Sequence, residues 1–421
     1  MKLRNASYSA LLAGLMALPG WAWAEIPEGT VLSAENIDEL YDQTFQGHKV
    51  KDLLTERLEW RIRESGFEMP MYHSQEIELD PSYQEATEAN RDTVSFNPDS
   101  RQVEGWKAGM PFPEISEDDP HIAEKLIWNW YYGQPRGDVM NVPNVTYMMV
   151  DGDSGVDRIQ NWWFLRYTMK GRLAADDPVA GDGSELSRTL FVATEPRDVR
   201  GLGTLSIRYD SDAMEDVWAY IPAVRRVRRL SGGAWMDPVG STDQLQDDIE
   251  IFNAQPSWYD EYRLVERRWV LAAANGREEN VNSGASDVDD QYPLFDLSQS
   301  PYWNVNFDRY EPREVWVIEA VPPSEHPYSK KVVYMDTQYP RLHYGEAYNQ
   351  AGDFWKFLQF NSTPGEGEDG FRDIRTNAGV VIDFLRNRAT IFIPDHAEWS
   401  TNTPGFSEDD IGVSTLRSVA R

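Results

Sequence analysis

After residue 140 the chain repeatedly alternates apolar and polar residues with a period of two, and this pattern constrains the fold more than any other feature of the sequence. Successive side chains of a β-strand point to opposite faces, so the alternation predicts strands with one buried face. Pairs typical of turns, such as Asp151-Gly152 and Pro322-Pro323, separate these segments. We expect a dozen strands, over residues 145–150, 158–169, 189–194, 203–209, 217–224, 262–272, 302–307, 314–320, 330–336, 340–348, 354–360 and 379–384.

A dozen sequential strands without predicted helices between them favour an antiparallel meander. Such a meander curls into a barrel or a half-barrel. We therefore expect a mainly β fold, in which residues 140–400 form one curved-sheet domain and residues 401–421 form a C-terminal tail.

Residues 25–139 have a different pattern, which predicts a helical extension followed by a connector. The apolar spacing of residues 33–66 fits helices, with Ser33 as the N-cap and an interruption near Gly47. Residues 80–117 contain four prolines and a weaker apolar pattern, so we expect them to be extended.

A further helix is predicted to begin at Asp119-Pro120, because aspartate is a common N-cap and proline is tolerated at the first helical position. The apolar residues of this helix would face the sheet: Ile122, Leu126, Ile127 and Trp130.

The first 24 residues have the three parts of a secretory signal peptide. Lys2 and Arg4 supply the charged region, residues 8–18 supply a short apolar region, and Ala22-Trp23-Ala24 matches an A-x-A cleavage site. We expect cleavage after Ala24 and a soluble periplasmic product, because no apolar stretch has the roughly 20 residues that a membrane-spanning helix needs.

Charge and cysteine content exclude several classes of protein. Loss of Lys2 and Arg4 with the signal peptide changes the formal net charge from −30 to −32. Nucleic acid is therefore not an expected partner, because phosphate binding needs a basic surface. The chain has no cysteine, which excludes disulfides, cysteine catalysis and a lipid-anchored N-terminal cysteine.

The familiar signatures of catalysis and cofactor binding are missing from the sequence. It has no G-x-S-x-G elbow, phosphate-binding loop, H-E-x-x-H motif or dinucleotide-binding glycine pattern. The six histidines are scattered singly, and a lone histidine is more often structural than a metal ligand. We therefore expect no catalytic residue, no metal and no cofactor.

Aromatic residues are abundant, and 14 of the 16 tryptophans follow residue 24. In a closed barrel these large side chains would fill the core. In a half-open barrel some of them would line a cavity for an apolar ligand. Trp162 and Trp163 are adjacent in a predicted strand and must point to opposite faces, so at most one of them lines such a cavity.

A basic cluster interrupts the acidic chain at Arg225, Arg226, Arg228 and Arg229. In one interpretation these side chains form ion pairs with acids that follow them in the sequence: Asp243, Asp247, Asp248 and Glu250. In the other they hold a phosphate or carboxylate head group at the mouth of the cavity, or they dock an acidic partner. In a strand, Arg225 and Arg229 would share one face, and Arg226 and Arg228 the other.

The segment around this cluster resembles a family of LolA-like periplasmic proteins of unknown function, related to the carrier that sorts outer-membrane lipoproteins. The matching residues are Tyr209-Asp210, Trp218, Tyr220, Pro222-Ala223, Arg225, Arg226, Arg228, Arg229, Asp243, Asp247-Asp248 and Tyr259-Asp260. The resemblance implies an open antiparallel half-barrel of about a dozen strands, with helices covering the concave side and an N-terminal helical extension. It also implies partnership with RND-type inner-membrane exporters and an outer-membrane protein.

We predict that ten residues contribute to ligand or partner binding: Trp218, Tyr220, Arg225, Arg226, Arg228, Arg229, Trp235, Asp243, Asp247 and Asp248. The leading hypothesis is a non-enzymatic carrier that passes a hydrophobic or amphipathic, lipid-like ligand between an inner-membrane exporter and the outer membrane. A second hypothesis is a lipid-sensing periplasmic adaptor or regulator. The third is a hydrolase acting on an apolar ester.

Overall fold

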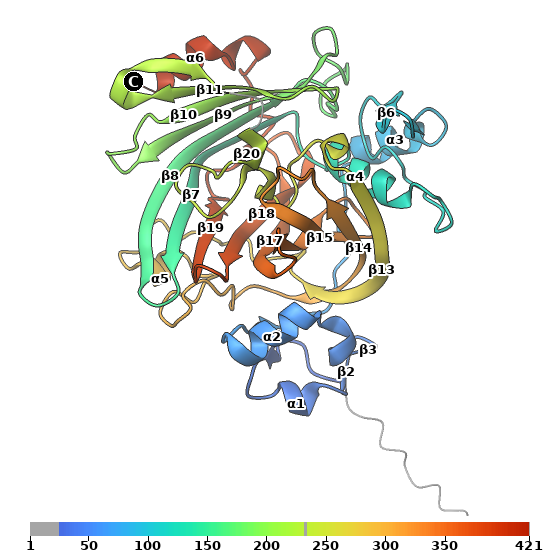
Figure 1. Ribbon diagram of the computed structural model, residues 1–421, viewed down its shortest axis with the longest axis vertical. Coiled ribbons are helices and arrows are strands. Elements are labelled where there is room, and N and C mark those ends of the chain that lie inside the picture. The colour runs from blue at the N-terminus through green and yellow to red at the C-terminus, as the bar shows by residue number, and fades with distance from the viewer. Residues whose placement is uncertain (1–24, 231–233, 421) are drawn as a thin grey trace, which may run out of the picture.

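The computed structural model describes residues 25–230 and 234–420, so the predicted signal peptide lies outside the described residues. One antiparallel sheet of 14 strands dominates the fold (Figure 1), and it follows the order β12-β11-β10-β9-β8-β7-β19-β18-β17-β16-β15-β14-β13, with β20 paired to β7. Because β12 and β13 lie at opposite edges, the sheet is curved but open. The predicted mainly β half-barrel is therefore confirmed.

The strands of this sheet are β7 (Val139–Asp151), β8 (Gly155–Thr168), β9 (Glu185–Glu195), β10 (Gly203–Tyr209), β11 (Asp216–Ile221), β12 (Arg226–Arg229), β13 (Glu261–Ala272), β14 (Glu311–Val321), β15 (Tyr328–Asp336), β16 (Leu342–Asn349), β17 (Phe354–Glu366), β18 (Arg372–Asp383), β19 (Arg388–Pro394) and β20 (Ser400–Thr401). Short strand pairs lie outside it: β1 (Val31–Leu32) with β4 (Met69–Pro70), β2 (Thr44–Phe45) with β3 (His48–Lys49), and β5 (Ser95–Asn97) with β6 (Gln102–Glu104).

The α-helices are short: α1 (Ile37–Leu40), α2 (Glu56–Glu64), α3 (Pro81–Asn90), α4 (Ile122–Tyr132), α5 (Val288–Gln291) and α6 (Val413–Val419). Single 3₁₀ turns are η1 (Val50–Leu53), η2 (Pro222–Val224), η3 (Ala234–Met236), η4 (Gln246–Asp248), η5 (Pro256–Trp258) and η6 (Glu408–Asp410).

Each face of the sheet packs against different segments. Residues 26–71, which include α1 and α2, share one apolar cluster with side chains of β13 to β17 on the convex face, below the sheet in Figure 1. On the same strands the concave face packs against α4 and residues 245–262. At the other end of the sheet, α6 covers the convex face of β8 to β11.

The N-terminal helices differ in detail from the sequence prediction. The predicted interruption near Gly47 is confirmed, because Gly47 adopts a φ of 83° in the turn between β2 and β3. The predicted N-cap at Ser33 is wrong, because Ser33 accepts backbone hydrogen bonds in a turn and Asn36 occupies the cap position of α1.

Residues 80–117 are not extended throughout, as predicted, because Pro81–Asn90 form α3. Asp80 caps this helix by accepting a hydrogen bond from the Ser82 amide at 2.9 Å. At α4 the same Asp-Pro signal caps a turn instead: Asp119 accepts from the His121 amide, and the helix begins at Ile122. The apolar face predicted for this helix is buried against the sheet as expected.

The strand predictions fail in four places. Residues 302–307 form a loop that buries Trp303 and Val305, so their apolar character reflects a core loop and not a strand. Conversely, β19 was not predicted, and β18 begins at Arg372 and not at residue 379. The strand predicted over 217–224 ends at Ile221, because Pro222 begins a 3₁₀ turn.

Candidate functional site

The concave face of β7 to β10 borders a cavity of about 360 Å³. This volume lies near the lower end of the roughly 300–1,000 Å³ that is usual for small-molecule pockets. Residues of β18 and β19 and of the segment 235–258, called here the cover segment, complete its walls. Six aromatic side chains line it: Tyr147, Trp162, Phe164, Phe191, Phe392 and Trp399.

Strand register gives the floor of this cavity a gradient of polarity. One row across neighbouring strands contains Phe164, Phe191 and Thr204. The next row contains Arg166, Thr189 and Ser206. Because all six residues line the cavity, its floor changes from aromatic to polar within one two-residue step along the strands.

The aromatic part of the cavity is ordered by ring contacts. Trp162 stacks on Phe191 with ring centroids 4.5 Å apart and an interplanar angle of 9°. Tyr147 meets Phe392 edge to face at 5.3 Å. Trp163, the neighbour of Trp162, lies on the opposite face and donates to Asn141 Oδ1 at 2.7 Å. The prediction that at most one of the two tryptophans lines a cavity is therefore confirmed.

The polar end of the cavity contains several charged side chains. Arg208 pairs with Glu215 and also donates to the Asn253 carbonyl at 3.0 Å. Glu250 pairs with Arg136 at 3.5 Å and with Arg341 at 3.3 Å. Burial by itself would raise the pKa of Glu250, but the two arginines outweigh burial and hold the pKa below its usual value. Glu250 is therefore ionised at neutral pH.

A buried ionic cluster fixes the cover segment to the sheet. Asp247 and Asp248 are fully buried, and Lys331 of β15 lies 2.9 Å from Asp247 Oδ2 and 3.0 Å from Asp248 Oδ1. Tyr259 donates to Asp247 at 2.6 Å, and Tyr328 donates to Asp248 at 2.7 Å. Buried charges are stable only when paired and hydrogen-bonded, so this network holds η4 in one position.

The same network sets the charge state of its members. Burial raises the pKa of Asp247, but the adjacent Lys331 ammonium and the hydrogen bonds of Asp247 outweigh burial and lower that pKa to about 2. Burial by itself would lower the pKa of Lys331. The adjacent carboxylates of Asp247 and Asp248 outweigh burial and raise that pKa above its usual value. Asp247 and Lys331 are therefore both ionised at neutral pH.

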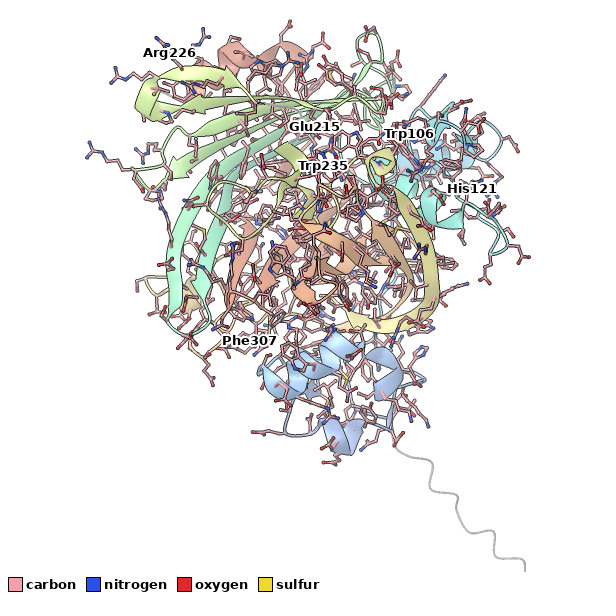
Figure 2. The ribbon with its side chains drawn as sticks, viewed as in Figure 1. Trp106, His121, Glu215, Arg226, Trp235 and Phe307 are labelled. Atoms are coloured by element: carbon pink, nitrogen blue, oxygen red, sulfur yellow. The ribbon has the colours of Figure 1, made fainter. Side chains whose placement is uncertain are left out.

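The ten residues predicted to bind a ligand or partner lie in separate places, and none of them lines the cavity. Trp218 and Tyr220 belong to the apolar cluster beneath α6 on the convex side. Asp247 and Asp248 are in the buried ionic cluster. The Trp235 ring lies with its centroid 5.1 Å from that of His326. Trp235 and Glu215 lie inside the curve of the sheet in Figure 2.

The four arginines lie at the edge of the sheet, and they do not pair with the acids considered above. Asp243 pairs with Arg386 at 3.2 Å and Arg388 at 3.6 Å, while Arg229 pairs with Asp216. Arg226, Arg228 and Arg229 belong to the edge strand β12, and Arg226 projects into solvent in Figure 2. Arg225 precedes the strand with a φ of 52°, so the predicted shared face of Arg225 and Arg229 is wrong.

Apart from its tryptophans, the cavity lining was missed by the sequence analysis, although a usable signal was present. Trp162, Phe164 and Arg166 alternate in one predicted strand and therefore share a face. An arginine on the face that carries two aromatic residues indicates a polar end to an apolar surface. Which face is concave depends on curvature, and that information is not local to the strand.

No group of three or more acidic or histidine side chains suited to a metal ion occurs within residues 25–230 and 234–420. Within the same residues no helix has the length and apolar character needed to cross a membrane.

Comparison with known proteins identifies the family. The DUF1329 family, described as proteins of unknown function, matches residues 31–412. This match spans most of the chain, so the chain belongs to the DUF1329 family. No curated protein sequence matches the chain.

Solved structures provide more distant likenesses. A domain assigned as an outer-membrane lipoprotein-sorting protein from Vibrio parahaemolyticus shares 17% identity and a TM-score of 0.43, covering 67% of this chain and 92% of that one. A DUF1329 protein from Desulfovibrio piger shares 17% identity and a TM-score of 0.42, covering 66% and 92%. A LolA superfamily protein from Nitrosomonas europaea shares 14% identity and a TM-score of 0.38, covering 67% and 92%.

Proposed function

We propose that this DUF1329 protein is a non-enzymatic periplasmic carrier, which takes a hydrophobic or amphipathic, lipid-like molecule into its sheet cavity and passes it between the two membranes. The observation that carries the proposal is the cavity of about 360 Å³ with six aromatic side chains in its walls. A fold stabilised only by its core would fill such a space, because interiors are packed as densely as organic crystals.

The construction of the cavity walls supports a binding role over an accidental gap. The cover segment that forms one wall is fixed by the buried ionic cluster, and the stacked pair Trp162 and Phe191 forms another. Preformed walls reduce the entropy lost when a ligand binds. We therefore place the ligand on the concave face of β7 to β10 and not at the predicted site residues.

We propose that an anionic partner binds at the arginine edge, which is defined as Val224 to Leu230, and that this contact places the partner next to the cavity. Val224 and Leu230 are 47% and 41% exposed, and Arg225, Arg226 and Arg228 are exposed between them. Exposed apolar residues beside arginines are suited to an anionic membrane surface. Leu230 also lines the cavity, so the arginine edge adjoins its mouth.

The membrane partners are proposed from the sequence resemblance. An RND-type inner-membrane exporter would supply the ligand, and an outer-membrane protein would receive it. Copurification of the protein with the exporter from a native envelope extract, by crosslinking in intact cells, tests this assignment. Recovery of an inner-membrane regulator in place of an exporter would instead support the adaptor hypothesis.

Binding of a neutral, environment-sensitive naphthylamine dye to purified, lipid-stripped protein tests the carrier proposal. We expect saturable binding with increased dye fluorescence, and competition by a long-chain alcohol. Thr204→Trp places an indole opposite Phe191 inside the cavity and should abolish binding. Val265→Trp adds the same side chain at a position of β13 that is 57% exposed, and it should bind as the wild type does.

Two outcomes would contradict the carrier proposal. One is folded, lipid-stripped wild-type protein without saturable binding of the dye. The other is Thr204→Trp protein that remains folded and binds the dye with unchanged affinity, because that result would place the dye elsewhere on the molecule.

A further inference from the structure

Arg166 occupies an unusual position at the polar end of the aromatic cavity. Its Nε atom is buried without a hydrogen-bond partner. Its guanidinium carbon lies 5.3 Å from the centroid of the Phe164 ring, so the side chain extends along the aromatic floor. A buried guanidinium nitrogen without a partner is costly, because this donor has lost its hydration and has gained no hydrogen bond in return.

The other basic residues at this end already have carboxylate partners. Arg208 pairs with Glu215, Lys170 pairs with Asp210, and Glu250 pairs with both Arg136 and Arg341. For Arg166, no carboxylate of residues 25–230 or 234–420 lies within ion-pairing distance. Arg166 therefore adds a positive charge that no ion pair offsets, while Glu215, Asp237 and Glu250 are the carboxylates that line the cavity.

A second, smaller hollow of about 70 Å³ adjoins the cavity at this end. The hollow and the cavity share five lining residues: Arg166, Ser187, Arg208, Glu250 and Asn253. A volume of 70 Å³ is about twice the roughly 30 Å³ that one water molecule occupies in the liquid, so it suits a small polar group and not an acyl chain.

Residues with hydroxyl groups neighbour Arg166 on the sheet. Thr189 lies directly across from Arg166, and Ser206 lies directly across from Thr189. Ser187 is two residues from Thr189 on the same face and lines both hollows. A guanidinium beside several hydroxyls provides the donors that carboxylate and phosphate oxygens accept.

We infer that Arg166 anchors an anionic head group, so that the ligand is a single-chain amphiphile ending in a carboxylate or phosphate, with its apolar chain on Phe164, Phe191 and Trp162. This inference rests on the proposed carrier function and specifies its ligand class. The head group would be held between Arg166 and the hydroxyls of Thr189 and Ser206. The apolar chain would follow the aromatic rows toward Tyr147 and Phe392.

Displacement of the bound naphthylamine dye by ligands of equal chain length tests the inference. Dodecanoate and dodecyl phosphate should bind wild-type protein about tenfold or more tightly than dodecanol, because a hydrogen bond to a charged group contributes more than a neutral one. Dodecyltrimethylammonium should bind more weakly than dodecanol. The ratio between the two anions distinguishes a carboxylate ligand from a phosphate ligand.

Arg166→Gln should remove the preference for the anions while dodecanol affinity stays within about twofold. Arg166→Lys should retain part of the preference, since it keeps the charge but loses the fork of donors. Arg158→Gln is the matched control, because Arg158 lies on the same strand, pairs with Asp198 and does not line the cavity. This control should keep the full preference.

Equal affinity of wild-type protein for dodecanol and both anions would overturn the inference and leave the carrier proposal standing. A preference that persists in folded Arg166→Gln protein would also overturn it. If Arg166→Gln does not fold, the wild-type comparison of anion with alcohol and the Arg166→Lys variant decide the question. Failure of the dye and every amphiphile to bind would instead contradict the proposed function itself.

Discussion

The two halves of the curved sheet use their concave faces in opposite ways. Over β13 to β17 that face is filled by α4 and residues 245–262, and the buried ionic cluster locks this filling in place. Over β7 to β10 the same face is left with a cavity. The comparison teaches that curvature alone does not create a binding site, because the same curved face is filled in one half and hollow in the other.

The convex faces of both halves are covered, by residues 26–71 on one half and by α6 on the other. In the open half, β8, β9 and β10 each bury a leucine on the convex face: Leu165, Leu190 and Leu205. This burial stabilises the strands by roughly 1.5–3 kcal/mol for each large apolar side chain. Stability of the open half thus does not depend on filling its cavity.

The largest effect is expected from breaking the closed half. Lys331→Met would leave Asp247 and Asp248 buried with too little positive charge, which should lower the free energy of unfolding by about 3–5 kcal/mol in urea titrations. Lys330→Met is the matched control, because Lys330 is partly exposed and pairs with Glu319. That change should cost less than about 1 kcal/mol. Equal losses for the two variants would contradict a structural role for the cluster.

Truncation of one phenylalanine in each half should give unequal losses of stability. Phe252 is 2% exposed in the closed half, and Phe252→Ala should cost about 3–5 kcal/mol. Phe191 is half-buried, with one side facing the cavity, and Phe191→Ala should cost about 1–2 kcal/mol. Only Phe191→Ala should also weaken dye binding, measured per molecule of folded protein. Urea unfolding and dye titration on the same samples measure both effects. A greater loss of dye affinity in Phe252→Ala than in Phe191→Ala would contradict the assignment of binding to the open half.

Acid should weaken the closed half through Asp247. Its folded pKa of about 2 lies below the ordinary aspartate value of 3.8, so ionised Asp247 contributes stability above that ordinary value. That contribution, about 2 kcal/mol, is lost as the pH falls from about 4 to about 2. Urea unfolding of wild type and Asp247→Asn over this range should show a shallower pH dependence in the variant. Parallel pH profiles would mean that Asp247 is not the group responsible.

Much of the closed half of the sheet could be predicted from sequence, because strand formation follows a local pattern. Strands such as β13, β14 and β15 were expected near their observed bounds, although their burial does not alternate strictly along the whole strand. The loop containing Trp303 and Val305 was mistaken for a strand because a buried loop can be as apolar as a strand. A local apolar pattern indicates that a segment is buried, but it does not determine the backbone geometry of that segment.

The candidate site could not be predicted in the same way, because its residues meet only through curvature and register. Phe191 and Phe392 are distant in sequence, and both reach the cavity only because β9 and β19 lie on the same concave face. The predicted acids Asp247 and Asp248 drew attention as charges, but their partner Lys331 lies in a strand whose alternation indicated only burial. Whether a charge is exposed or buried depends on its partners elsewhere in the chain.

The smallest effect on stability is expected at the two edges of the sheet, which differ in how their arginines are paired. On β13, Arg263 pairs with Glu319 at 3.1 Å and Arg267 pairs with Glu314 at 2.7 Å. On β12, Arg226 and Arg228 are exposed. Replacing either pair of arginines with glutamine should lower the unfolding free energy by less than about 1 kcal/mol for each residue.

The two edges should nevertheless differ in binding to anionic vesicles. The carboxylates that pair with the arginines of β13 offset their attraction to lipid phosphates. Arg226→Gln with Arg228→Gln should weaken cosedimentation with phosphatidylglycerol vesicles, since each arginine near such a surface contributes about 1 kcal/mol. Arg263→Gln with Arg267→Gln should leave cosedimentation unchanged, and salt should weaken the wild-type interaction by screening. Equal binding by both double variants would remove the arginine edge as the membrane contact. Saturable binding of the dye in both would show that the cavity works independently of either edge.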